Sequence, residues 1–319
     1  MAKLISLIIP VYNEKDNIPL IYQALLEQLE KIKDLYDYEM IFVDDGSKDQ
    51  SLQKIQELAV KNPKVKSLEF SRNFGKEFAT TAGLQYCAGD AAILIDADLQ
   101  HPPKLLPEFL AKWQAGADMV IGIRKSYQHP SLFKTVSSTL FYKIMNFISG
   151  TKITEKATDY RLIDRKVINE FNRLTEHNRI TRGLLDWLGF KRDYIYFQAE
   201  KRINGKVSYN KIKLLKLAIS ALITHSLFPL KFAGYLGVLI IMFSGPLGFF
   251  IFVDKYMIND PFGFAFSGPA ILAVINLFLV GITLSCLGLI ALYIGNIQTE
   301  VMNRPIYIIR SKKNIGKNQ

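Results

Sequence analysis

Ala91-Ala92-Ile93-Leu94-Ile95-Asp96-Ala97-Asp98-Leu99-Gln100 is the stretch that decides the fold of this 319-residue chain. Its first half is an apolar run of strand length, and its second half contains two carboxylates and an amide. A strand that is apolar on both faces is typical of a parallel sheet covered by helices. The polar half then follows the carboxyl end of the strand, which is where α/β folds bind ligands.

The flanking sequence repeats this alternation of apolar runs and helical patterns. We expect strands at Leu4–Val11, Glu39–Val43, Val65–Phe70, Ala91–Ile95 and Met119–Ile123. Between the first two, apolar residues recur at helical spacing, and Ser47 followed by Gln50 predicts a capping box at the start of the next helix. This order predicts an α/β, Rossmann-like domain with a parallel sheet.

Every predicted strand runs into polar residues. These ends are Pro10-Val11-Tyr12-Asn13-Glu14, Asp44-Asp45-Gly46-Ser47, Ser71-Arg72-Asn73-Phe74-Gly75-Lys76, Asp96-Ala97-Asp98-Leu99-Gln100 and Arg124-Lys125. A single acidic turn would be interpreted as an ordinary helix cap. Acidic and basic groups at five strand ends predict a binding site at one edge of the sheet.

The acidic end suits a hard divalent cation. In an extended segment Asp96 and Asp98 face the same side while Ala97 faces away, and Gln100 can add an amide oxygen. Mg²⁺ takes one or two carboxylates and completes its shell with water and substrate phosphates, so Mg²⁺ or Mn²⁺ is the expected cofactor. A bound diphosphate would need further cations, for which Lys76, Arg124 and the basic run 201–206 are candidates. The alternative for that run is a solvated loop.

Charge is nearly absent from a long C-terminal region. Between Phe232 and Gly295 the only formal charges are Asp254, Lys255 and Asp260. The apolar runs 232–253 and 269–295 each exceed the roughly 20 residues that a helix needs to cross the hydrocarbon, and they predict a transmembrane hairpin. Two buried helices of a soluble domain are the alternative. Basic residues on both flanks predict cytoplasmic termini and a multi-pass protein of the plasma (inner) membrane.

Two further segments are amphipathic or apolar beside basic residues. Residues 131–149 and 211–230 are expected to lie in the lipid interface, although core helices of the soluble domain would show the same pattern. The predicted organisation is a cytoplasmic catalytic domain over 1–210, an interface helix over 211–230, the hairpin over 231–296 and a cytoplasmic tail over 297–319. Within the tail, Ile306 to Ile309 has the composition of an added strand. Cys87 and Cys286 predict neither a disulfide nor a zinc site.

Six motifs together carry a resemblance to a known family. They are Pro10-Val11-Tyr12-Asn13-Glu14, Val43-Asp44-Asp45-Gly46-Ser47, Ser71-Arg72-Asn73-Phe74-Gly75-Lys76-Glu77, Asp96-Ala97-Asp98-Leu99-Gln100, Asp159-Tyr160-Arg161-Leu162 and the basic run 201–206. With them the chain resembles the inverting family-two glycosyltransferases of GT-A fold that include dolichol-phosphate mannose synthase and bacterial bactoprenol (undecaprenyl-phosphate) glucosyltransferases. The two-helix tail is similar to the bactoprenol branch.

This resemblance implies roles for individual residues. Those implied to contact the nucleotide sugar are Pro10, Tyr12, Glu14, Asp44, Asp45, Lys76, Ala97, Arg124 and Arg202. Those implied to bind metal are Asp96, Asp98 and Gln100. Asp159 looks like the family's catalytic base. A phosphate monoester, however, is already anionic at neutral pH, since its second pKa is near 6, so Asp159 is as well explained as a residue that positions the acceptor or binds metal with Asp96 and Asp98.

The resemblance also implies the substrates, namely UDP-glucose and a polyprenyl phosphate. An alternative donor is another sugar nucleotide such as GDP-mannose, for which the mechanism would be the same and only the nucleotide pocket would differ. A non-catalytic nucleotide-binding membrane scaffold is the alternative of a different class, although it would not need charged residues at every strand end. The net charge of +11 is compatible with nucleic acid, an anionic membrane surface or phosphorylated substrates, so its sign alone decides little. The resemblance implies no nucleic-acid partner. Homo-oligomerisation stays open.

Overall fold

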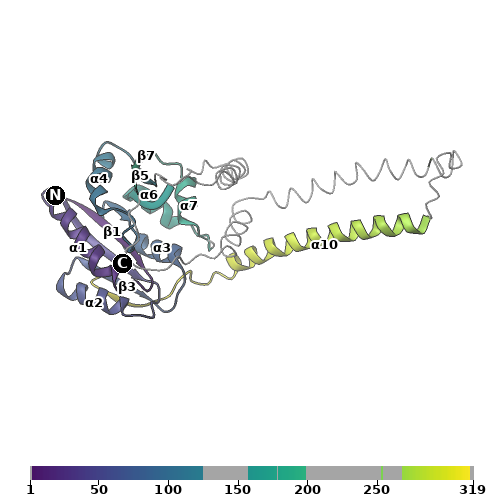
Figure 1. The fold of residues 1–319 in the computed structure, drawn as a ribbon, viewed down its shortest axis with the longest axis horizontal. Coiled ribbons are helices and arrows are strands. Elements are labelled where there is room, and N and C mark those ends of the chain that lie inside the picture. Colours follow the sequence, from purple (N-terminus) through teal and green to yellow (C-terminus); the bar gives the residue numbers. More distant parts are fainter. Residues whose placement is uncertain (1, 125–156, 178, 199–252, 254–267, 317–319) are drawn as a thin grey trace. The chain divides into compact units, whose positions relative to one another are not determined.

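The protein is described by a computed structural model that covers residues 2–124, 157–177, 179–198, 253 and 268–316 (Figure 1). The chain divides into two compact units. One comprises Met1–Ser208 with Arg304–Gln319, and the other comprises Tyr209–Asn303. The C-terminal segment therefore belongs to the same unit as the N-terminal domain, although the two are far apart in the sequence.

One mixed sheet forms the centre of the first unit. Its strands, within the described residues, are β1 Lys3–Val11, β2 Tyr36–Asp44, β3 Val65–Phe70, β4 Ala91–Leu94, β5 Met119–Arg124, β6 Ala157–Asp164, β7 Arg192–Phe197 and β8 Ile309–Lys313. They lie in the order β7-β5-β6-β4-β1-β2-β3-β8. The five strands predicted from apolar runs are all confirmed. The predicted α/β class is confirmed with them.

The five predicted strands run parallel to one another, as expected, but the sheet as a whole is mixed. Strands β4, β1, β2 and β3 pair in parallel, but β6 lies antiparallel between β4 and β5, and β8 is antiparallel to β3. The apolar pattern did not predict β6, because Asp159 and Arg161 interrupt it. That insertion is important for the site, since it brings Asp159 beside the end of β4.

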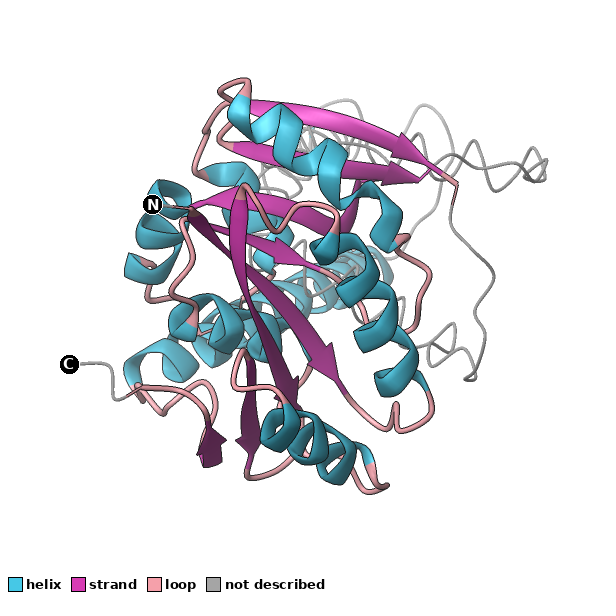
Figure 2. Ribbon diagram, turned by 90° about the vertical axis from the view of Figure 1, so that its left-hand side faces the viewer, coloured by secondary structure: helices cyan, strands magenta, loops and turns pink. Residues whose placement is uncertain are grey.

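Helices cover both faces of the sheet, as Figure 2 shows. They are α1 Asn17–Glu30, α2 Ser51–Lys61, α3 Lys76–Tyr86, α4 Leu106–Gln114, α6 Arg165–Arg173 and α7 Thr181–Trp187, with a short 3-10 turn at Pro103–Leu105. Side chains of β1 alternate between two cores, since Leu7 and Ile9 pack with α1, α2 and α4, whereas Ile8 packs with α3, α6 and α7. This alternation follows from the period of two along a strand.

The predicted capping box at Ser47 is wrong. Helix α2 begins at Ser51, four residues later, and its N-cap Gln50 makes no side-chain capping bond. The Oγ of Ser47 instead accepts from the backbone N–H of Asn13 (3.0 Å), and the Oγ of Ser51 accepts from that of Glu14 (2.8 Å). Both serines therefore join the loop after β1 to the loop after β2, and they help to fix two of the predicted polar strand ends.

A long helix, α10 (Gly268–Val301), spans the second predicted membrane run and extends six residues beyond it. In the described parts of the chain, no helix combines the length and the apolar character that crossing a bilayer requires. The first run, 232–253, lies outside the described residues apart from Val253, as do the expected interface helices 131–149 and 211–230. The hairpin and the interface helices thus stay predictions. The tail does add a strand, but at Ile309–Lys313 rather than at Ile306 to Ile309.

Candidate functional site

Two buried aspartates lie at the end of β2, Asp44 as its last residue and Asp45 directly after it. The carboxylate of Asp45 accepts hydrogen bonds from the backbone N–H groups of Phe74 (2.7 Å) and Gly75 (2.9 Å) and from Nδ2 of Asn73 (2.9 Å). Burial nevertheless raises the pKa of Asp45 to about 6. Asp44 bonds the backbone N–H of Ser47 (3.2 Å), and burial raises its pKa as well. Asp45 therefore organises the loop between β3 and α3, which leads directly to Lys76.

Gly46 follows these aspartates at a point of close backbone approach. Its φ is +68°, and a Cβ at this position would lie 2.5 Å from the carbonyl carbon of Arg72 and 2.7 Å from the amide nitrogen of Asn73. A side chain here would thus combine a left-handed backbone with a clash against main-chain atoms. The glycine is what allows the loops after β2 and β3 to lie against each other.

We expect Gly46→Ala to lower the free energy of unfolding by about 2–3 kcal/mol, because the strained φ and the displaced loop both cost stability. Gly189 is the matched control. Its φ is +73°, but a Cβ there would meet nothing closer than 3.9 Å. Gly189→Ala should cost only about 1 kcal/mol. Thermal melting of the two purified variants checks this, and equal shifts would contradict the role of the clash.

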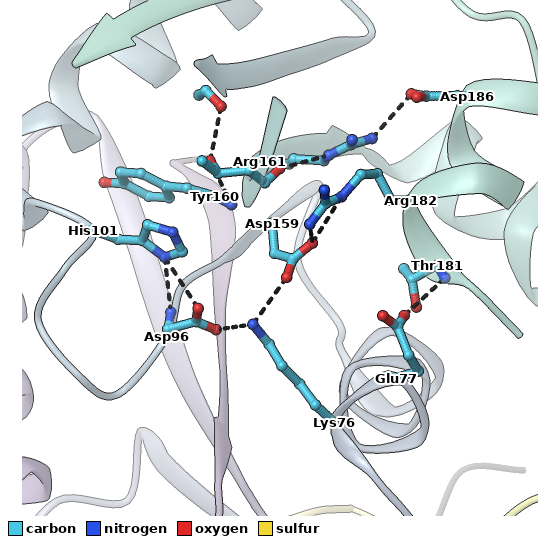
Figure 3. Close-up of polar contacts among 12 residues, drawn as sticks. Lys76, Glu77, Asp96, His101, Asp159, Tyr160, Arg161, Thr181, Arg182 and Asp186 are labelled. Carbon is cyan, nitrogen blue, oxygen red and sulfur yellow. Dashed lines mark hydrogen bonds and ion pairs between the residues drawn. The ribbon is translucent and has the colours of Figure 1, made fainter. Parts of the chain in front are cut away.

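Four charged side chains from four elements form a connected network, shown in Figure 3. Lys76, the first residue of α3, places its Nζ 2.6 Å from Oδ1 of Asp96 and 2.9 Å from Oδ2 of Asp159. Nη2 of Arg182, on α7, lies 2.7 Å from Oδ1 of Asp159. Asp96 follows β4 and Asp159 lies on β6. The sheet order thus brings together residues that are distant in the sequence.

The network fixes the charge of its members. Burial alone would raise the pKa of Asp159, but the neighbouring Lys76 and Arg182 outweigh it and hold that pKa well below its usual range. Burial would likewise lower the pKa of Lys76, but Asp96 and Asp159 outweigh it and raise the pKa above its ordinary value. A carboxylate with so low a proton affinity is a weak general base. The geometry favours Asp159 as a group that positions Lys76 and Arg182.

The acidic loop after β4 is a turn rather than an extended segment. The chain turns at Ala97 and Asp98, and Leu99 adopts a left-handed φ of +61°, which is uncommon for a branched side chain. Ala97 is buried in the core, and the extended geometry expected for the two aspartates is wrong. Asp98 is also buried, and its Oδ1 accepts from the backbone N–H of Gln100 (3.1 Å).

The ring of His101 stabilises this loop through a hydrogen bond to its backbone. Its Nδ1 accepts from the backbone N–H of Asp96 (3.3 Å), and its ring stacks on Tyr160 with centroids 5.1 Å apart. Burial lowers the pKa of His101, which favours the neutral ring that this bond requires. The hydroxyl of Tyr160 donates to the carbonyl of Pro102 (3.1 Å). The side chain of Asp96 is thereby left facing Lys76, as Figure 3 shows.

The fit of a metal ion depends on the donors present. Among the described residues, no group of three or more His, Cys, Asp or Glu side chains is arranged to hold a metal. Asp96 and Asp98 supply carboxylates on one short loop, and the side chain of Asp96 is one-quarter exposed. Two carboxylates are what Mg²⁺ takes from protein when phosphates complete its shell. The donor set fits a cation that binds together with a phosphorylated ligand.

A buried ion pair holds β6 against α7. Nη1 of Arg161 lies 3.1 Å from Oδ1 of Asp186, and the two side chains are 1% and 2% exposed. Nε of Arg161 also donates to the carbonyl of Thr158 (3.1 Å), and Oε2 of Glu77 accepts from the backbone N–H of Thr181 (2.8 Å). These contacts fix α7, from which Arg182 reaches Asp159. A small pocket lies among them and is lined by Lys76, Glu77, Asp159, Arg161, Thr181 and Arg182.

The remaining predicted site residues are placed as follows. Pro10 lies on β1, Tyr12 is 43% exposed just beyond it, and the Glu14 carbonyl accepts from the amides of Asn17 and Ile18 at the start of α1. Arg124 is the exposed last residue of β5. Arg202 lies outside the described residues. All but Arg202 thus follow or end a strand of the sheet.

Sequence reasoning missed two members of the site. Arg182 lies in no strand-end motif, and only its place in a segment rich in arginine, 179–182, gave a signal. No motif in the sequence includes His101. Its position directly after the acidic loop was the available signal. It is buried, and its contact with Asp96 makes it part of the support of the site.

Comparisons with known proteins agree with this architecture. The family model described as "Glycosyl transferase family 2" matches residues 6–171. The bactoprenol glucosyl transferase of Shigella phage SfX is 39% identical over 97% of this chain and 99% of its own, and a prophage bactoprenol glucosyl transferase homolog of Escherichia coli K12 has the same identity and coverage. A solved structure of glucosyl-3-phosphoglycerate synthase from Mycobacterium tuberculosis, in complex with Mn²⁺, UDP and glucosyl-3-phosphoglycerate, aligns with a TM-score of 0.51 at 18% identity. It covers 70% of this chain and 78% of that one.

Proposed function

Because the chain belongs to glycosyltransferase family 2, we propose that it transfers one glucose from UDP-glucose to a polyprenyl phosphate, with inversion and release of UDP. The relatives named bactoprenol glucosyl transferase support the donor sugar and the lipid acceptor, since they match almost the whole chain. The solved neighbour supports the GT-A fold.

The observation that carries the proposal is the network of Lys76, Asp96 and Asp159 at the carboxyl edge of the sheet. A scaffold that only bound nucleotide would have no need for a lysine held between two carboxylates that come from separate strands. A transferase has that need, because the departing diphosphate develops charge that must be met by fixed positive groups. Lys76 and Arg182 supply such groups, and we assign the same task to Arg124 and Arg202.

Asp96 and Asp98, with Gln100, are the residues that would hold Mg²⁺ or Mn²⁺ together with the diphosphate. When bound, the cation supplies Lewis-acid stabilisation of the leaving group. The chain's own residues orient the reactants. Lys76 holds the side chain of Asp96 in place through its ammonium group, and His101 fixes the backbone of the same residue. Pro10, Tyr12, Glu14, Asp44 and Asp45 are assigned to the nucleoside, since they lie at the neighbouring strand ends.

The acceptor needs little activation. A phosphate monoester already has an anionic oxygen at neutral pH, and Asp159 is held as a carboxylate of low proton affinity. We therefore assign Asp159 a positioning role. It fixes Lys76 and Arg182 so that both cations face the diphosphate and the incoming phosphate.

We expect Asp159→Asn to lower kcat by about ten- to a hundredfold while the donor Kd changes less than about threefold. The amide keeps one acceptor oxygen but loses the charge that holds both Lys76 and Arg182. Rates at several pH values check the role. A positioning residue leaves the shape of the pH profile unchanged in the variant. Loss of an ionisation from that profile would indicate a base instead.

The membrane part of the proposal rests on the sequence. We place the hairpin 232–253 and 269–295 in the plasma membrane, with the catalytic domain and both termini in the cytoplasm, because basic residues flank the apolar runs. The interface helices 131–149 and 211–230 would then lie beside the lipid head groups, where an acceptor phosphate is found. Modification of single cysteines introduced into each terminus, in intact and permeabilised cells, tests this orientation.

The function itself is tested by incubating the purified full-length protein with Mn²⁺, a short-chain polyprenyl phosphate and a set of radiolabelled nucleotide sugars. We expect transfer from UDP-glucose into the lipid fraction, and a rate that is lower by about a hundredfold or more after chelation of the metal. If only GDP-mannose served as donor, the proposed donor would be wrong and the proposed mechanism would still hold. Nucleotide binding without transfer from any donor would contradict the enzyme proposal and favour the scaffold.

A further inference from the structure

The segment Arg304–Lys313, here called the C-terminal strap, follows α10 and lies along the edge of the sheet. Its strand β8 pairs with β3, and the backbone N–H of Ser71 donates to the carbonyl of Ile308 (2.9 Å). Nη2 of Arg310 donates to the carbonyl of Ser71 (2.7 Å), and its Nη1 donates to Oε1 of Glu69 (3.0 Å). The strap thus holds the residue at which the loop between β3 and α3 begins.

An aromatic series runs from the strap into that loop. The ring of Tyr307 stacks on Phe70 with centroids 5.0 Å apart and planes 12° apart. Phe70 meets Phe74 edge to face, with centroids 5.7 Å apart at 86°, and the guanidinium of Arg72 lies 4.1 Å from the Phe74 ring centroid. Each such contact favours one arrangement of its two groups. Tyr307 therefore acts on Phe74 through one intervening ring.

Phe74 is also the residue that joins the loop to the donor side of the site. Its backbone N–H donates to Asp45, as does that of Gly75, and the next residue is Lys76. The strap also contacts the helix that follows the loop, because the hydroxyl of Tyr307 donates to Oε1 of Gln85 near the C-terminal end of α3. One tyrosine on the strap thus contacts the strand before the loop and the helix after it.

We propose that Tyr307 is a positioning residue for the donor site, and that the C-terminal strap sets the conformation of residues 71–76 and hence the affinity for the nucleoside diphosphate. The inference rests on the proposed function for the identity of the ligand. Only Met302 and Asn303 separate α10 from the strap. Eight residues, 296–303, separate the run that we assign to the membrane from the strap, so the donor loop is linked to that run through a short stretch of chain.

The test uses the full-length protein with Tyr307→Ala, Tyr307→Phe and Asn314→Ala. Asn314, the residue directly after the strap, is the matched control, because its Nδ2 donates to the carbonyls of Ala59 and Val65 without touching the aromatic series. We expect Tyr307→Ala to weaken UDP binding about tenfold and to raise the donor KM similarly, with the acceptor KM unchanged and kcat preserved at saturating donor. Tyr307→Phe keeps the stack and should restore affinity to within about threefold of wild type.

Hydrogen exchange of the backbone amides of Phe74 and Gly75 provides a second measurement that needs no nucleotide. Tyr307→Ala should accelerate their exchange at least about tenfold, and Asn314→Ala should not. Unchanged exchange in Tyr307→Ala overturns the proposal, and so does an equal loss of UDP affinity in Asn314→Ala. If exchange accelerates but the wild type binds no UDP, the positioning role stands and the proposed donor is wrong.

Discussion

Asp96→Asn is expected to lower turnover by about a hundred- to a thousandfold. The substitution keeps the size of the side chain but removes a charge from the loop assigned to the cation, and it removes the anionic partner of Lys76. Loss of one fixed group that stabilises a departing anion has effects of about this size in enzymes. Steady-state rates with UDP-glucose and a polyprenyl phosphate check the expectation. Chelation should lower the wild-type rate to a similar level.

Asp193→Asn is the matched control for Asp96→Asn. Asp193 is also an aspartate paired with a lysine, since Nζ of Lys112 lies 3.0 Å from its Oδ2, but it is on β7 and away from the network around Asp159. Its substitution should change turnover less than about twofold, as exposed ion pairs contribute little. If the Asp96→Asn enzyme retained full activity in chelator-treated buffer, neither the requirement for a metal ion nor the proposed role of Asp96 would hold.

Arg161→Met is expected to lower the free energy of unfolding by about 3 kcal/mol or more. Removing one partner leaves Asp186 charged in a position where its side chain is 2% exposed, and an uncompensated buried charge is costly. Arg192, whose Nη1 lies 3.4 Å from Asp186, compensates in part. Thermal melting of the purified protein measures the loss. Turnover should fall as well, because α7 carries Arg182 to Asp159.

The double variant Arg161→Met with Asp186→Leu distinguishes a lost ion pair from a stranded charge. It replaces both charges by apolar groups, so we expect it to be more stable than Arg161→Met alone. A double variant that is less stable than the single one would mean that attraction within the ion pair itself stabilises the fold, and that the loss in Arg161→Met is not due only to the unpaired charge of Asp186. Lys166, which pairs with Asp118 at the surface, offers a control, since Lys166→Met should change the melting temperature little.

The sequence by itself determined the α/β class, the five strands β1 to β5 and the edge of the sheet at which the site lies. This was possible because a buried strand is a local apolar run, and because polar residues directly after such runs must lie at one edge of a parallel sheet. Asp96, Asp159 and Lys76 were each found in this way or through the resemblance. The family assignment, which the comparisons confirm, followed from the same local motifs.

Only the tertiary structure decided which of these residues meet. The antiparallel insertion of β6 between β4 and β5 sets Asp159 beside Asp96, and no local pattern encodes the direction or the neighbours of a strand. The same applies to Arg182, which reaches Asp159 from a helix that the motifs do not include, and to Tyr307, whose partner Phe70 is more than two hundred residues away. Side-chain periodicity reports burial along one element, whereas pairings between elements depend on packing of the whole sheet.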